Sequence, residues 1–305
     1  MNLLTKIKHK LKDSIISQQR LRTELDSVKF YCRRIDLENK IRNCTEMGVV
    51  PAQPGCKQII VSLTTHGKRL WDVCFAIESL MQQTVKPNRI VLWLDEKLKD
   101  SPLPLALVKQ SARGLEIRYT RDLKPYTKLI PALKEFPEDV IITVDDDMAY
   151  DFDVIEKLTN AYKAEPDCIH ACLLKAMTFD KNGQLTGYNS WKNSTSTRGQ
   201  HLIMGVGGVL YPPHTLSSEV MNEEVFTSIC PTADDVWFTA MALLNNTPIN
   251  KVTTRSSLGE DFIVNDKVQD IALRIKNVYG RENDVQIKAV FSRYGTYKRL
   301  KDLTY

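Results

Sequence analysis

The 305-residue sequence contains no long apolar run, and this absence excludes the simplest membrane topologies. No stretch approaches the ~18 consecutive apolar residues that a transmembrane helix needs. Lysines interrupt the apolar side chains of the first ten residues, so these residues lack the continuous apolar centre of a secretory signal peptide. We therefore expect the protein to be made in the cytosol and to stay there.

Paired cysteines are missing as well. The seven cysteines are odd in number, and no two have the C-x-x-C spacing of a zinc ribbon. This pattern is typical of free thiols in a reducing compartment. Cys168 and Cys172 flank His170, but the apolar residues around them favour a buried strand over a metal site.

A basic face on the main body is also absent. The net charge is +5, yet residues 1–45 hold eleven Lys and Arg against five Asp and Glu. The remaining residues hold 31 basic and 32 acidic side chains, which leaves the body close to neutral. Because a nucleic-acid-binding domain needs a basic surface on its folded body, we expect no nucleic-acid partner.

A basic amphipathic segment occupies residues 1–45, and three partners are open for it. Its first part has apolar side chains on one helical face and lysines on the flanks, which fits an anionic membrane surface: Leu3, Leu4, Ile7, Leu11 and Ile15. Its second part keeps an apolar spacing that fits a short coiled coil, and hence a homo-oligomer: Leu21, Leu25, Val28, Cys32 and Ile35. The third possibility is a helix docked on its own body. We favour membrane contact, with the protein peripheral on the inner face.

The rest of the chain divides into a Gly- and Pro-rich linker at 46–57, a domain at 58–255 and a helical tail at 256–305. Within the domain, strands and helices alternate. The expected strands are 59–63, 89–94, 115–119, 140–144 and 168–174; the expected helices are 70–82, 103–112, 128–135, 152–163 and 233–244. This alternation predicts an α/β fold with a doubly wound, mostly parallel sheet.

Polar side chains follow the first four strands, at the sheet edge where ligands of such folds bind. The sharpest feature is Asp145-Asp146-Asp147, directly after an apolar strand. Three adjacent carboxylates repel one another, and a cation relieves this repulsion. Asp145 and Asp147 point the same way in an extended chain and can bind one hard cation. The alternative is a solvated turn before the next helix.

Residues 144–148, Val-Asp-Asp-Asp-Met, followed by an acidic helix start, resemble the Asp-x-Asp segment of GT-A glycosyltransferases. The resemblance covers residues 58–245, and the order of its short motifs is what makes it specific. Residues 59–65 and 89–95 are similar to the first two nucleotide-binding strands, 126–129 to a segment with a basic contact, and 232–238 to the Glu-Asp motif of inverting members. Two positions depart from the pattern: residues 95–97 replace the usual Asp-Gly-Ser, and Asp234 replaces Glu.

This resemblance implies a GT-A-type enzyme that transfers a sugar from a UDP-sugar donor to a saccharide or lipid-linked acceptor. Transfer with inversion, in cell-surface polysaccharide synthesis, is implied too. Mn²⁺ or Mg²⁺ would be held by Asp147 with Asp145, Asp235 would be the general base, and Asp234 would contact the acceptor. The implied nucleotide-sugar contacts are Thr64, Thr65, Asp95, Lys128, Asp145, Asp146, Gly207 and Gly208.

Simpler interpretations stay open for these residues. Asp234 and Asp235 are also what a helix start favours, Lys128 can be a surface lysine, and the glycines can form an ordinary turn. Three other functions remain. One is a retaining transferase, in which Asp235 is not the base. Another is a nucleotidyltransferase, whose Gly-rich basic loop is poorly matched by residues 64–68, and the third is a non-catalytic scaffold that binds no UDP.

Overall fold

The computed structural model describes residues 31–254 and 280–302 continuously, together with 262–265, 268–269, 277–278 and scattered positions between 17 and 29. The strands are β1 (Ile59–Thr64), β2 (Arg89–Asp95), β3 (Leu115–Thr120), β4 (Val140–Thr143), β5 (Met148–Tyr150), β6 (Ile169–Ala171), β7 (Leu174–Ala176), β8 (His201–Ile203), β9 (Val209–Tyr211), β10 (Ile249–Lys251) and β11 (Phe262–Val264). The labelled α-helices are α2 (Val73–Met81), α3 (Leu105–Ser111), α4 (Ile130–Glu135), α5 (Val154–Ala164), α6 (Glu223–Ile229), α7 (Asp234–Leu244), α8 (Glu282–Tyr294) and α9 (Thr296–Asp302).

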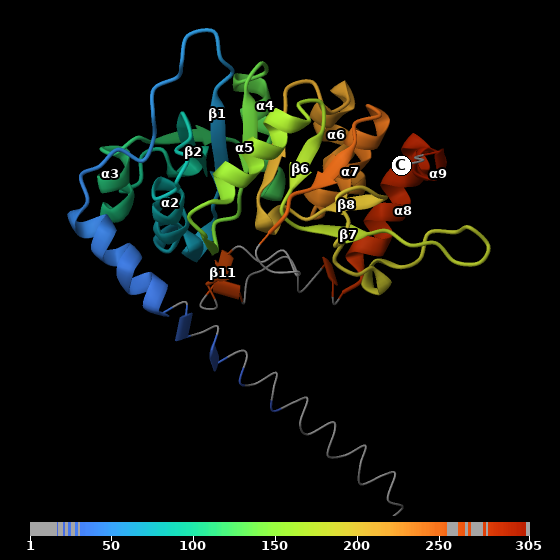
Figure 1. Ribbon diagram of the computed structural model, residues 1–305, viewed down its shortest axis with the longest axis horizontal. Helices are drawn as coiled ribbons and strands as arrows, with labels where there is room; N and C mark the ends of the chain where they lie inside the picture. Colours follow the sequence, from blue (N-terminus) through green and yellow to red (C-terminus); the bar gives the residue numbers. More distant parts are fainter. Residues whose placement is uncertain are drawn as a thin grey trace, which may run out of the picture.

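A seven-stranded sheet forms the centre of the molecule, in the order β10-β6-β9-β4-β1-β2-β3 (Figure 1). The pairs β1–β2, β1–β4, β2–β3 and β6–β10 are parallel. Strand β9 is antiparallel to both of its neighbours, β4 and β6. The predicted α/β class with a mostly parallel, doubly wound sheet is therefore confirmed.

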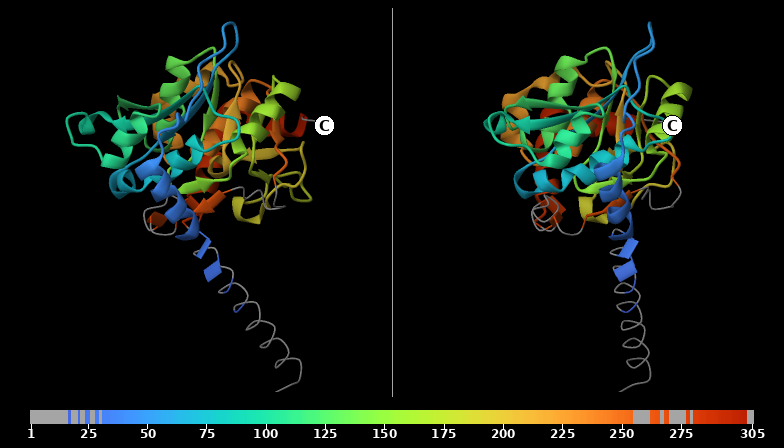
Figure 2. Two further views of the ribbon diagram at one scale, coloured as in Figure 1. Left: turned by 60° about the vertical axis from the view of Figure 1, so that its left-hand side comes forward. Right: turned by 90° about the vertical axis from the view of Figure 1, so that its left-hand side faces the viewer.

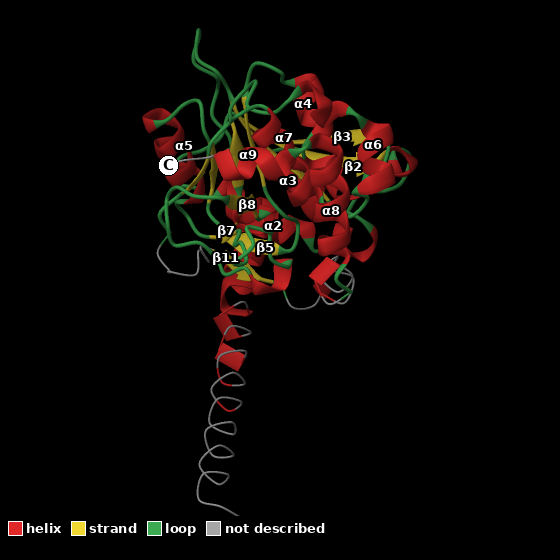
Figure 3. Ribbon diagram, turned by 90° about the vertical axis from the view of Figure 1, so that its right-hand side faces the viewer, coloured by secondary structure: helices red, strands yellow, loops and turns green. Residues whose placement is uncertain are grey.

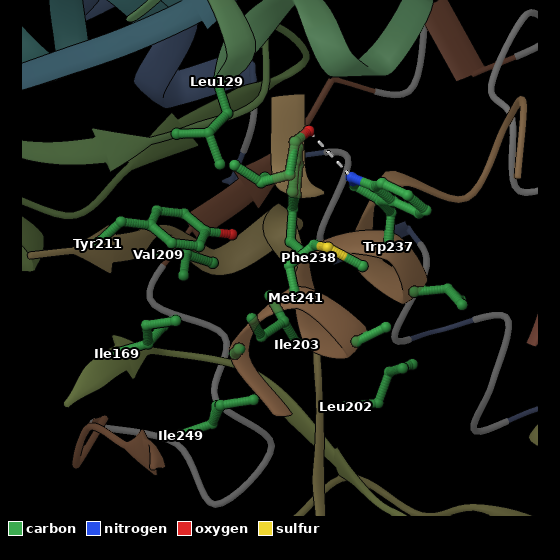
Figure 4. Close-up of a cluster of buried hydrophobic side chains, with 14 of the residues drawn as sticks. Leu129, Ile169, Leu202, Ile203, Val209, Tyr211, Trp237, Phe238, Met241 and Ile249 are labelled. Carbon is green, nitrogen blue, oxygen red and sulfur yellow. Dashed lines mark hydrogen bonds between the residues drawn. The ribbon is translucent and has the colours of Figure 1, made fainter. Parts of the chain in front are cut away.

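Helices cover both faces of this sheet because its central strands are apolar on both sides (Figure 3). In β1, Ile60 faces one core and its neighbours Val61 and Leu63 face the other. The first core contains the apolar faces of α7 and α8. Figure 4 shows Trp237 and Phe238 of this core beside the strands, with the indole N–H of Trp237 donating to a backbone carbonyl. The second core contains α2 and α5.

Two predicted elements differ from the structure. The single strand expected at 168–174 is divided into β6 and β7, which belong to different sheets. The chain turns at Cys172, whose N–H donates to the Gly208 carbonyl (3.1 Å). The second difference is β11, which lies in the range expected to be a helical tail. Its sequence, Phe-Ile-Val, suits a strand, and it pairs antiparallel with β5.

Residues 31–43 form a helix that packs on the body (Figure 2). Leu37 and Ile41 are buried in the same core as α2, and the Arg34 guanidinium lies over the Phe75 ring. This part of the N-terminal segment is docked intramolecularly. The apolar face expected at 3–15 lies outside the described residues. Among the helices that the structure describes, none combines the length and apolar character needed to cross a membrane.

Candidate functional site

The strand order places two polar segments side by side. From β1 the chain proceeds outward through β2 and β3, whereas β4 returns to the other side of β1. In open α/β sheets, ligands bind beyond the carboxyl ends of the strands at such a reversal of order. Here the carboxyl end of β1 leads into Thr65, and that of β4 leads into Asp146. The Thr65 hydroxyl donates to the Asp146 carboxylate (2.6 Å).

Arg69 pairs with two of the three adjacent carboxylates. It lies in the 3-10 helix Gly67–Trp71 that follows β1, and its side chain is buried. Its guanidinium contacts Asp146 Oδ1 (2.8 Å) and Asp147 Oδ2 (3.0 Å). Asp147 Oδ2 also accepts a hydrogen bond from the Gln269 amide (2.8 Å). One buried cation therefore serves both carboxylates.

Lys128 occupies the centre of a second acidic group. It ends the 3-10 helix Lys124–Lys128, and its Nζ lies 2.9 Å from Asp145 Oδ1 and 3.2 Å from Asp234 Oδ2. The second contact pairs the Lys128 ammonium with the buried carboxylate of Asp234. Beside it, Asp235 Oδ1 accepts the N–H of Gly205 (3.0 Å). Helix α7 thus directs its first two side chains toward the acidic segment after β4.

The two groups form one electrostatic unit with more acid than base. Its members are Arg69 and Lys128 as cations, and Asp145, Asp146, Asp147, Asp234 and Asp235 as acids. With every group ionised, two positive and five negative charges leave a formal charge of −3. A buried site of this kind holds excess protons or attracts a cation.

The pKa values of the acids show the effect of burial and of the excess negative charge. Burial, and then the Asp234 charge, raise the pKa of Asp235 to about 8. Burial also raises the pKa of Asp234, although Lys128 opposes it. The pKa of Asp147 is raised to about 6, by burial and then by Asp145. Burial alone would lower the Lys128 pKa, but the surrounding carboxylates outweigh burial and hold it well above its usual value.

The predicted site residues fall into two sets. Thr65, Lys128, Asp145, Asp146, Asp147, Asp234 and Asp235 come together as described above. Asp95, at the end of β2, accepts the N–H of Lys97 (3.1 Å), and Thr64 donates to the Trp93 carbonyl (2.9 Å). Both lie at the carboxyl edge of the sheet, outside the hydrogen bonds and ion pairs described above for the acidic unit.

The predicted glycines have other neighbours. A side chain on Gly207 would meet Leu173 Cβ at 3.2 Å, and Gly208, with φ of 95°, faces α5. The glycine that touches the site is Gly205. A Cβ there would lie 2.7 Å from Lys128 Nζ and 3.0 Å from Asp235 Oδ1. Gly207 and Gly208 therefore shape the turn, whereas Gly205 allows the backbone to approach the charged groups.

Sequence reasoning missed Gly205, Arg69, Gln269 and Tyr150. The Tyr150 hydroxyl accepts the N–H of Asp145 (2.8 Å) and donates to the Val206 carbonyl (3.2 Å), which links β5 to the glycine turn. The sequence does hold a signal for Arg69. It is a basic residue a few positions after the first strand, and the three adjacent aspartates are expected at the same edge of the sheet. Gln269 is separated from its partner by more than a hundred residues, and no local pattern marks such a contact.

The donor set fits a hard divalent cation. Asp145 and Asp147 are close enough for the first to raise the pKa of the second, and the Asp145 side chain is 28% exposed, so it can be reached from solvent. Within the described part of the chain, no three His, Cys, Asp or Glu side chains are grouped as a complete metal centre. Mg²⁺ commonly uses one or two carboxylates together with substrate phosphates, and such a site needs no third protein ligand.

Comparison with known proteins gives a limited result. No family model matches the chain, and no curated protein matches it either. Among solved structures, the chain is similar to CMP:2-keto-3-deoxy-manno-octonic acid synthetase complexed with CTP. The identity is 12%, the TM-score is 0.40, and the match covers 65% of this chain and 90% of the synthetase. A likeness of this size concerns the path of the chain and does not extend to the residues of the site.

Proposed function

We propose that the protein is an inverting glycosyltransferase that uses a nucleotide-sugar donor, with Asp235 as general base. The observation that supports this best is the pair of acids at the start of α7. One of them, Asp234, is buried and pairs with the Lys128 ammonium (3.2 Å). The other, Asp235, has a pKa raised to about 8. A hydroxylated acceptor can donate to the first carboxylate and supply the proton that a base must remove.

The proposed reaction assigns a distinct part to each acid. A neighbouring hydroxyl of the acceptor donates to Asp234, which positions the acceptor, and the attacking hydroxyl transfers its proton to the Asp235 carboxylate. The acceptor oxygen then forms a bond to the anomeric carbon while the bond from that carbon to the diphosphate oxygen breaks. The nucleoside diphosphate leaves with the electron pair. A base with a pKa near the working pH is effective in this role, and contributes about 10²–10⁴ in rate.

Donor binding is assigned to the other half of the site. A divalent cation, Mg²⁺ or Mn²⁺, held by Asp145 and Asp147, would neutralise the charge that develops on the diphosphate. The three adjacent aspartates are well suited to this because the site carries excess negative charge. Thr64, Thr65 and Asp95 lie at the edge where the nucleoside would bind. We propose UDP as the nucleotide, from the resemblance of this segment to GT-A enzymes.

Nucleotidyl transfer is the second candidate, and the synthetase found in the comparison belongs to that class. That chemistry requires basic groups presented to a triphosphate after the first strand. In this chain the Arg69 guanidinium is already paired with two carboxylates and with the Val268 carbonyl (3.2 Å). Because the guanidinium is already occupied, it is not presented to a triphosphate, and this favours the glycosyltransferase.

One experiment separates the two candidates. Purified protein with Mn²⁺ is incubated with a panel of nucleotide sugars and, separately, with CTP or UTP and free sugars or sugar acids. We expect slow release of UDP from one nucleotide sugar and no release of pyrophosphate from a triphosphate. Pyrophosphate release that depends on a sugar would establish nucleotidyl transfer instead. An absence of turnover together with an absence of UDP binding in calorimetry would support a scaffold.

A further inference from the structure

The helix of residues 31–43 has two different faces, and only one of them is covered. The body covers the face that carries Leu37 and Ile41, which are 0% and 8% exposed. The opposite face carries Cys32 and Ile35, and it is exposed, with Ile35 at 60%. A helix that needed only to dock on its own body would have polar residues on this outer face.

The exposed face continues toward the N-terminus as a regular stripe. Its described members are spaced alternately by four and three residues: Leu21, Leu25, Val28, Cys32 and Ile35. Leu21, Leu25 and Val28 are 67%, 52% and 57% exposed. In the sequence, Leu4, Ile7 and Leu11 precede the stripe in the same register, with polar residues at positions 14 and 18. The apolar positions keep a spacing of 3.5 residues without interruption over 21–35, and this spacing is typical of a coiled coil.

We propose that this stripe is the seam of a parallel coiled coil between two copies of the chain. In heptad notation, Leu25 and Cys32 occupy a positions, and Val28 and Ile35 occupy d positions. The docked face then consists of b, c and f positions, so the body and the second copy contact opposite sides of one helix. The covered and uncovered faces therefore have separate partners.

Charge complementarity favours the second copy as the occupant. Glu24 falls at a g position and Lys29 at the e position five residues later, and both are exposed. In a parallel, in-register dimer, g of one helix faces this e position of the other, which pairs Glu24 with Lys29 of the second copy in both directions. A stripe that only faces lipid does not require charges of opposite sign at the g and e positions beside it. The proposal does not depend on the reaction that the body performs.

The test measures the mass of the full chain by sedimentation equilibrium at concentrations on the order of 10 µM, because dimerisation depends on concentration. We expect the mass of a dimer for the wild type and of a monomer for Leu25→Arg. The matched control is Leu105→Arg, on α3, where the side chain is 70% exposed and off the stripe; this variant should stay dimeric. At concentrations low enough to keep the wild type monomeric, all three should have the same melting temperature, because neither leucine is buried within a single chain.

A chemical test examines the register. Under mild oxidation, Cys32 at an a position faces its own symmetry mate, within the range of Cα separations that a disulfide permits. Covalent dimers should form in the wild type and in Cys56→Ser, where a second exposed cysteine is removed, and should be lost in Cys32→Ser. A monomeric wild type, or a dimer that Leu25→Arg leaves intact, would overturn the proposal. A monomer that loses binding to anionic vesicles on Leu25→Arg would assign the stripe to lipid instead.

Discussion

The substitution Asp235→Asn separates binding, chemistry and stability at one position. Asn has nearly the same shape as Asp, and its Oδ1 can still accept the N–H of Gly205, now 3.0 Å away. The change removes one negative charge and the capacity to take a proton. Because the carboxylate lies on the side of the site formed by α7, donor binding at the segment after β4 should be little affected.

The expected loss of activity follows from the role of a general base. Transfer should fall by about 10²–10⁴ while the affinity for the donor stays near that of the wild type. The wild-type kcat/KM should rise with pH up to about 8, because the pKa of Asp235 is raised to about 8 and only the ionised form accepts the proton. The Asn variant should lack this rise.

The same pKa predicts a gain in stability for the variant. Burial, and then Asp234, raise the pKa of Asp235 to about 8, whereas an Asp in an unfolded chain ionises near 3.9. The folded chain therefore binds a proton that the unfolded chain releases, and its stability falls as pH rises from about 4 to about 8, by up to about 1.4 kcal/mol per pH unit. Asn does not titrate, so the variant should gain up to about 3 kcal/mol over the wild type between pH 6 and pH 8.

Two measurements check these expectations. Transfer kinetics are followed across pH 6–9 in steps on the order of 1 pH unit, and urea unfolding is measured at both ends of that range. Asp234→Asn is the control, since it removes the neighbouring charge and should reduce transfer less. Loss of transfer in Asp234→Asn with retention in Asp235→Asn would exchange the two roles. Full activity in both variants would refute the general-base assignment and leave an acidic helix start.

Three further predictions concern other parts of the molecule. Asp147→Asn should keep the fold, although it alters the buried ion pair with Arg69, and should lose Mn²⁺-dependent UDP binding in calorimetry; binding with unchanged metal dependence would contradict the metal assignment. Gly205→Ala places a methyl group 2.7 Å from Lys128 Nζ and should lower kcat, whereas Gly187→Ala, with no neighbour closer than 3.6 Å, should not. Deleting residues 1–30 should make the chain monomeric while UDP binding persists; loss of salt-sensitive binding to anionic vesicles from a wild type that is itself monomeric would assign these residues to lipid.

The local patterns of the sequence predict the central sheet well. Apolar runs such as 140–144 are bounded by polar or turn residues, and their alternation with helices determines the fold class. The single strand expected at 168–174 was wrong because periodicity does not report where a chain leaves one sheet for another. The turn at Cys172 is set by its contact with Gly208, which lies far along the chain.

The candidate site was predictable to a similar extent. Asp145 and Asp147 could be found because they directly follow an apolar strand, and Lys128 and the acids of α7 because their segments resemble those of GT-A enzymes. Of their partners, Arg69 could have been found from its place a few residues after the first strand, whereas Gln269 acquires its role only through a contact made by the folded chain. Gly205 was overlooked for the same reason: a Gly-rich segment shows that a turn exists, but not which glycine faces the charges.

Strand β9 has a consequence for the order of folding. Among the described strands, it lies between the β1–β4 half of the sheet and the β6–β10 half, and its antiparallel pairing with β4 joins segments distant in sequence. Such non-local pairings form late, after the local βα units. Because Gly205 lies on the turn that leads into β9, the insertion of this strand also brings the backbone N–H to Asp235. We therefore expect closure of the sheet and the contact between the Gly205 N–H and Asp235 to form together, and amide exchange at residues 209–211 to report on both.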